Sequence, residues 1–142
     1  MADPSYAFCT STDNSTVGNG ITPVSIGDWK AQLIGGSSIA MTSNGPVLQP
    51  GTYLVRYNAT LRGRGRDTVA MGLVLSGTPV PGSVQAGYPS STFDSEQLAG
   101  SALVLVTNPG SLLSLAIWTS GCKIALNNSD TVSAQMTVYP LN

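Results

Sequence analysis

Histidine is absent from this 142-residue chain, and charged residues make up only 9% of it. The missing histidine removes the commonest general base from any catalytic arrangement. Two cysteines without a histidine cannot complete a zinc site. Six Lys and Arg against seven Asp and Glu give a net charge of −1, which offers no electrostatic support for general nucleic-acid binding. These shortages argue against an enzyme, a zinc protein and a nucleic-acid binder.

Long apolar runs are missing too, since none approaches the length of a membrane span. The first residues, Met1-Ala-Asp-Pro-Ser, contain no basic region followed by an apolar stretch, and therefore do not resemble a signal peptide. We expect no membrane partner. The protein either leaves its cell without a cleaved signal or has been trimmed from a longer chain. Virion and spore-coat proteins need no signal, because cell lysis releases them.

Residues that could bind a metal ion or act through a thiol are also few. Cys9 and Cys122 lie far apart in the sequence, and a disulfide needs their Cα atoms within about 7 Å. We treat them as unpaired small apolar residues, although the sequence leaves their pairing open. Asp94 and Glu96 are two carboxylates where calcium takes six to eight oxygens, and we interpret them as solvated loop charges rather than a glycosidase pair. No cofactor or metal site is expected.

What the chain has is a hydrophobic content of 42%, enough for one packed domain. Residues 1–20 are rich in Ser, Thr, Asn and Asp and show no strand pattern. We predict an extended N-terminal arm over 1–20, anchored to a partner by Tyr6 and Phe8, followed by a domain over 21–142. A frayed terminus is the alternative interpretation of the arm.

From residue 21 onward, short apolar runs alternate with turn residues, as in a sandwich or barrel. In 52–61 (TYLVRYNATL), the odd-numbered residues from Tyr53 face one way and the even-numbered residues, Arg56 among them, the other. In 69–76 (VAMGLVLS), one face holds the larger residues and the opposite face small ones, so something must pack closely there. Further strands are predicted at 98–107, 112–118, 123–126 and 132–139, with weaker candidates at 22–26, 30–34 and 37–41 and a long loop over 85–96.

This pattern gives about eight to ten strands and no significant helix. An all-β, double-sheet jelly-roll sandwich is the architecture that fits such a count. An immunoglobulin-like sandwich is the alternative, but the two cysteines do not have its spacing.

Several segments resemble one family. Residues 50–57 (PGTYLVRY) resemble the PGTYxVxY strand of C1q/TNF-like jelly rolls, in the bacterial form that ends BclA-like collagen-like spore-surface glycoproteins. Residues 70–83 (AMGLVLSGTPVPGS) are similar to that family's LxLNGxxVPGS hairpin. Residues 98–115 resemble its next pair of strands, and 133–141 (SAQMTVYPL) its closing strand. Phage head-fibre and decoration domains are similar. No collagen-like Gly-X-Y repeat precedes the domain, and residues 1–20 match nothing in the family.

The resemblance implies a tight homotrimer. The residues support it independently, because stretches such as Leu103–Val106 are apolar on both faces, whereas a sandwich buries one face of each sheet. Closed cyclic symmetry can cover the second face. The residues expected in the core and the trimer interface are Tyr53, Val55, Tyr57, Met71, Leu73, Leu103, Leu105, Leu113, Leu115, Met136 and Val138.

One charge cluster stands out, because Arg62, Arg64 and Arg66 are half of the basic residues. The favoured interpretation is a soluble hairpin loop. The functional interpretation is an anion or glycan contact, joined by Tyr88 from the long loop.

Two functions follow. The first is a non-enzymatic, homotrimeric structural or decoration module on the exterior of a virion or a spore, attached to a capsid or spore-surface protein through the arm. The second is a lectin-like adhesin on the same fold that binds a host glycan or a receptor. Jelly rolls serve both functions, so the fold alone does not choose between them.

Overall fold

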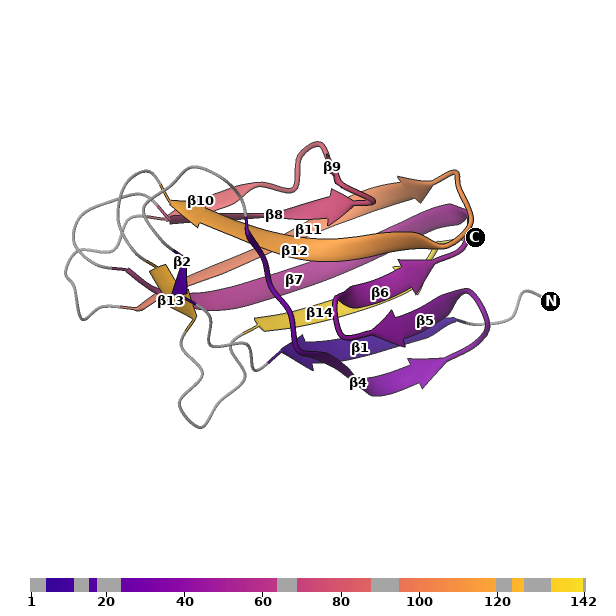
Figure 1. The fold of residues 1–142 in the computed structure, drawn as a ribbon. Helices are drawn as coiled ribbons and strands as arrows, with labels where there is room; N and C mark the ends of the chain where they lie inside the picture. The colour runs from indigo at the N-terminus through magenta and orange to yellow at the C-terminus, as the bar shows by residue number, and fades with distance from the viewer. Residues whose placement is uncertain are drawn as a thin grey trace.

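The computed structural model describes residues 5–11, 16–17, 24–63, 69–87, 95–119, 124–126 and 134–141. These residues form fourteen β-strands in two antiparallel sheets, with no helix in the described part of the chain (Figure 1). The predicted all-β jelly-roll sandwich is confirmed.

The first sheet holds the longest strands. Its principal order is β11 (Ser95–Val106), β7 (Gly51–Gly63), β14 (Ala134–Pro140), β1 (Tyr6–Ser11) and β4 (Trp29–Gly35). The short strand β13 (Ile124–Leu126) pairs with the end of β7 and with β2 (Thr16–Val17). Thus β7 lies between β11 on one side and β14 and β13 on the other.

The second sheet lies over the first (Figure 1). Its order is β10 (Gln85–Gly87), β8 (Val69–Leu75), β12 (Ser111–Thr119), β6 (Gly45–Leu48) and β5 (Ile39–Thr42). The two-residue strand β3 (Val24–Ser25) pairs with β12, and β9 (Thr78–Pro79) pairs with β8.

The core forms where alternate residues of both sheets point inward, as a period of two requires. In β7 the odd-numbered residues from Tyr53 to Ala59 are buried, and in β8 Met71 and Leu73 are buried, so both predicted strand faces are correct. The largest fully buried side chains are Tyr53, Tyr57, Ile26, Leu48, Met71, Leu73, Leu113, Leu115, Ile117 and Met136.

Tyr57 connects the two sheets. Its hydroxyl donates a short hydrogen bond to the carbonyl oxygen of Ser83, in the segment before β10. The Ser83 hydroxyl accepts the Leu73 N–H at 3.0 Å and donates to the Val80 carbonyl at 2.7 Å. Gly100, the partner of Tyr57 across the β11–β7 ladder, leaves room for the ring, since a Cβ there would lie 2.8 Å from the tyrosine oxygen.

The small-residue face of β8 also has its predicted neighbour. A Cβ added at Gly72 would lie 3.3 Å from the indole of Trp118 and 3.3 Å from Val84. The tryptophan of β12 therefore packs over the glycine, on the side of the second sheet that faces away from the core.

The N-terminal arm predicted over 1–20 is wrong for Tyr6–Ser11. These residues form β1, which pairs with β14 on one side and β4 on the other. Ala7 and Cys9 are buried in the core, while Tyr6 and Phe8 lie on the opposite face of the sheet. The pattern was hard to recognise because the buried positions hold small residues rather than large aliphatic ones.

The eleven residues predicted for the core and the trimer interface fall into two groups. Leu103 and Leu105 are exposed, whereas the other nine are at most 2% exposed inside one chain and cannot contact a second copy. Alternation had placed those nine on inward faces, but it could not tell an intramolecular core from an interface between subunits.

Candidate functional site

The face of the first sheet that points away from the second sheet is the candidate site. The strand register arranges its side chains in rows across β11, β7 and β14. One row reads Leu103, Leu54 and Tyr139; the next reads Ser101, Arg56 and Thr137; the third reads Ala99, Asn58 and Gln135. The face thus changes from apolar to polar within three successive rows.

Its apolar end carries large side chains with no cover. Leu103 is 62% exposed, Leu105 65% and Leu141 51%, and Leu54 and Tyr139 are half-buried beside them. Together these five residues make up the apolar patch. Of the seven large hydrophobic residues that are exposed in the described chain, five lie on this face: Tyr6, Leu33, Leu103, Leu105 and Leu141. Such clustering marks a surface that contacts another molecule.

The apolar surface continues around the edge of β11. A hollow of about 350 Å³ separates β11 from the β8–β9 hairpin. It is lined by Leu75, Thr78, Pro79, Val80, Pro81, Leu103, Val104 and Leu105. Leu103 and Leu105 therefore border both the sheet face and this edge hollow.

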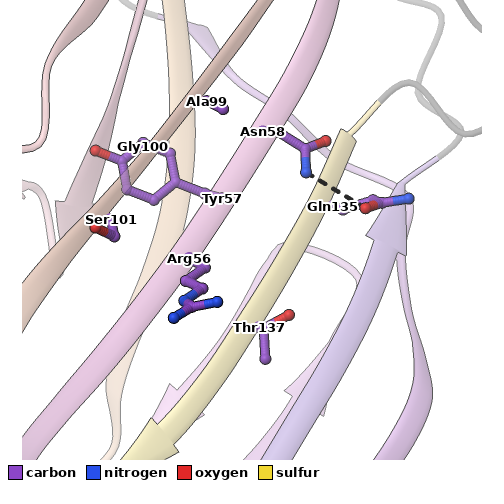
Figure 2. A pocket seen from close by; sticks show the side chains of 8 residues that line it. All are labelled: Arg56, Tyr57, Asn58, Ala99, Gly100, Ser101, Gln135 and Thr137. Atoms are coloured by element: carbon purple, nitrogen blue, oxygen red, sulfur yellow. Dashed lines mark hydrogen bonds between the residues drawn. The ribbon is translucent and has the colours of Figure 1, made fainter.

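The polar end of the face is hollowed into an open groove of about 530 Å³ (Figure 2). It is lined by Arg56, Tyr57, Asn58, Ala99, Gly100, Ser101, Gln135 and Thr137, and we call these residues the polar groove. The outward side chains of β11 in these rows, Ala99 and Ser101, are short, whereas β7 and β14 present the longer side chains of Arg56, Asn58 and Gln135.

Hydrogen bonding orders part of the groove wall. The Asn58 side-chain amide donates to the Gln135 side-chain oxygen at 3.3 Å, between neighbouring strands (Figure 2). Arg56 is exposed in the row next to this pair, with Ser101 and Thr137 as its cross-strand neighbours. Among residues whose side chains are described, Asp28 is the single carboxylate, and no ion pair to Arg56 is present.

The predicted anion or glycan contact cannot be located. Arg64, Arg66 and Tyr88 lie outside the described residues, and of Arg62 only the backbone, at the end of β7, is described. Sequence reasoning assigned no role to Arg56, although it had placed this residue on the outward face of its strand. The available signal was that Arg56 is the one charged residue within the predicted strand 52–61.

Cys9 is a free thiol in the core, and burial raises its pKa to about 12. It is therefore unsuited to act as a nucleophile at neutral pH. Cys122 and Asp94 lie outside the described residues, as does the side chain of Glu96. The described residues contain no group of three or more His, Cys, Asp and Glu placed to hold a metal ion. They also contain no helix with the length and apolarity to cross a membrane.

No protein-family model matches the sequence, and no curated protein does. Solved structures do share its fold. "PRD1 vertex protein P5" is 13% identical with a TM-score of 0.64, over 100% of this chain and 99% of that one. Murine APRIL at pH 8.5 is 11% identical with a TM-score of 0.68, over 97% and 99%. Eiger TNF from S. frugiperda is 14% identical with a TM-score of 0.62, over 99% and 94%. The likeness establishes a TNF-like jelly roll.

Proposed function

We propose that this chain is a non-enzymatic structural module that assembles as a homotrimer on the exterior of a virion. The observation that carries the proposal is the apolar patch, in which Leu103 and Leu105 are each more than 60% exposed. Isolated exposed leucines are common on protein surfaces, but a contiguous group on one sheet face needs a cover. A second copy of the same chain is the simplest cover.

The geometry favours a ring over a two-fold dimer. The apolar surface has two distinct parts that meet at β11, namely the sheet face beside β14 and the edge hollow beside β9. If the edge of one copy packs on the face of the next, the contact joins two different surfaces. Such heterologous contacts close into rings, and three copies make the ring that the family resemblance implies.

The location is inferred from two sources. The similarity to a vertex protein favours a virion exterior. The sequence resemblance to spore-surface glycoproteins gives the spore as the second candidate. The attachment segment is not Tyr6–Ser11, because those residues belong to the sheet.

The test is the mass of the native protein in solution. Light scattering should give three times 14.6 kDa for the wild type. The double variant Leu103→Glu/Leu105→Glu should run as a monomer, because six carboxylates cannot be buried in the interface. Val84→Glu is the matched control, since Val84 is 54% exposed but lies outside the apolar patch, and it should remain trimeric. A wild type that is a folded monomer at micromolar concentration would exclude the proposal.

A further inference from the structure

The polar groove is not explained by self-association. Apolar contacts account for the row of Leu103, Leu54 and Tyr139, but the next two rows present a guanidinium, two hydroxyls and two amides. A sheet surface that serves only to support the fold does not require a hollow of about 530 Å³ beside the guanidinium of Arg56. That volume lies within the ~300–1,000 Å³ range of small-molecule sites.

We infer that the polar groove binds a carboxylate-bearing saccharide, with Arg56 holding the carboxylate and the surrounding hydroxyl and amide groups holding the sugar hydroxyls. This inference goes beyond the proposed assembly and uses none of the residues of the apolar patch.

The charge of the groove selects the class of anion. Arg56 offers a planar fork that matches a carboxylate with two parallel hydrogen bonds. A phosphate or a nucleic-acid backbone would call for several cations, whereas Arg56 is the one cation among the described residues that line the groove. A single positive charge balances a single carboxylate.

The other polar groups fit the rest of a sugar. Ser101 and Thr137 lie on either side of Arg56 in the same cross-strand row, and each hydroxyl both donates and accepts. Asn58 and Gln135 fix each other by their hydrogen bond, which leaves further donor and acceptor capacity directed at the groove. Five polar side chains on three rigid strands suit a small, polyhydroxylated ligand better than an apolar peptide side chain.

The floor of the groove is rigid. Gly100 lies against the Tyr57 ring, and the Tyr57 hydroxyl is held by the Ser83 carbonyl. A larger residue at 100 would have to displace this ring. The floor of the groove is therefore formed by two strands, β7 and β11, that the core packing holds in place.

The experiment is a titration of isotope-labelled, native protein followed by two-dimensional amide NMR. The probes are glucuronic acid, its neutral counterpart glucose, and acetate, which has the carboxylate without the hydroxyls. Glucuronic acid should shift the amide signals of residues 56–58, 99–101 and 135–137. Glucose and acetate should each bind at least about tenfold more weakly, because each lacks one of the two recognised features.

Two variants locate the site. Arg56→Gln removes the charge from an exposed position and should weaken glucuronic acid binding about tenfold or more. Lys30→Gln is the matched control, since Lys30 is exposed on the same sheet face but does not line the groove, and binding should not change. Light scattering on both variants should still give the native mass, which separates this test from that of the trimer.

Several outcomes would overturn the inference. Equal binding of acetate would show a general anion site, and equal binding of glucose would show that Arg56 is not used. Equal loss in both variants would show long-range electrostatics, and absence of any shift with glucuronic acid would exclude the site.

Discussion

The two outer faces of the sandwich differ in how much of their apolar surface the chain itself covers. On the second sheet, Trp118 packs over Gly72 beside Val84, which is 54% exposed, and a hollow of about 230 Å³ remains next to them. On the first sheet, Leu103 and Leu105 have no such cover within the described chain. Trp118 covers part of the outer face of the second sheet, whereas the exposed leucines of the first sheet lie together without such a cover. This open face of the first sheet is therefore where the partner surface is to be sought.

The largest expected effect concerns the open face. If the apolar patch joins the subunits, unfolding is coupled to dissociation and the melting temperature rises with protein concentration. We expect a clear rise across about a hundredfold range of wild-type concentration. Leu103→Glu/Leu105→Glu should melt lower and at a temperature independent of concentration. Scanning calorimetry at several concentrations measures both, and a wild-type midpoint that never moves would contradict the coupling.

A second effect comes from comparing two glycines that each face an aromatic ring. At Gly100 a new Cβ would lie 2.8 Å from the Tyr57 oxygen inside the core, whereas at Gly72 it would lie 3.3 Å from the rim of Trp118 near the surface. We expect Gly100→Ala to lower the free energy of unfolding by about 2 kcal/mol, the cost of overpacking. Gly72→Ala should cost about 1 kcal/mol or less, because Trp118 can move outward. Urea denaturation of the two variants gives the order, and a reversed order would show that the tyrosine yields more easily.

The outer face of the second sheet, where Trp118 lies over Gly72, gives a third test. Trp118→Ala removes the cover of Gly72 and should cost about 2 kcal/mol, less than a fully buried aromatic because Trp118 is half-buried. If the subunits meet at the apolar patch, as proposed, the native mass should stay that of the trimer. Loss of the trimer in this variant would mean that the two faces have been assigned the wrong roles.

At neutral pH the smallest effect is that of Cys9, because its contribution changes only as the pH rises above 9. Burial raises its pKa from an ordinary value of 9.0 to about 12, so the folded protein holds the thiol proton more tightly than the unfolded chain. The resulting stabilisation is complete below pH 9 and is lost as the pH rises from 9 to 12, at about 1.4 kcal/mol per pH unit.

Denaturation of the wild type and Cys9→Ala at increasing pH isolates this contribution, because Tyr53 and Tyr57, whose pKa values burial also raises, are present in both proteins. Identical pH slopes in the two proteins would show that Cys9 has an ordinary pKa.

The sequence predicted those strands whose inward positions hold large residues. Tyr53, Val55 and Tyr57 define β7, and Met71 and Leu73 define β8, because bulky side chains at every second position leave no other interpretation. The sequence did not predict β1, because its inward positions hold the small residues Ala7, Cys9 and Ser11, which give no clear alternation with the residues between them. The sequence did not predict β6 either, because Pro46 lies inside it and proline argues against a strand.

The candidate site was only partly predictable. Alternation correctly placed Arg56 on the outward face of β7, but the groove depends on which strands lie beside it. That Ser101 and Thr137 flank Arg56 follows from the β11–β7 and β14–β7 registers, which bring together residues 45 and 81 positions apart in the sequence. The sequence named Leu103 and Leu105 as interface residues, but it did so together with nine residues that lie in the core. Periodicity shows which residues share a face of a strand, but it does not show whether another part of the same chain covers that face.

The position of β1 has a consequence for the order of folding. Cys9 is the ladder partner of Met136, so two segments near opposite ends of the sequence lie side by side in the middle of the first sheet. During synthesis the strand around Cys9 can pair with β4 early, but its other edge must wait until residues 134–138 have left the ribosome. Closing so long a loop is slow, and we expect the pairing of β1 with β14 to be one of the last steps in the formation of the first sheet.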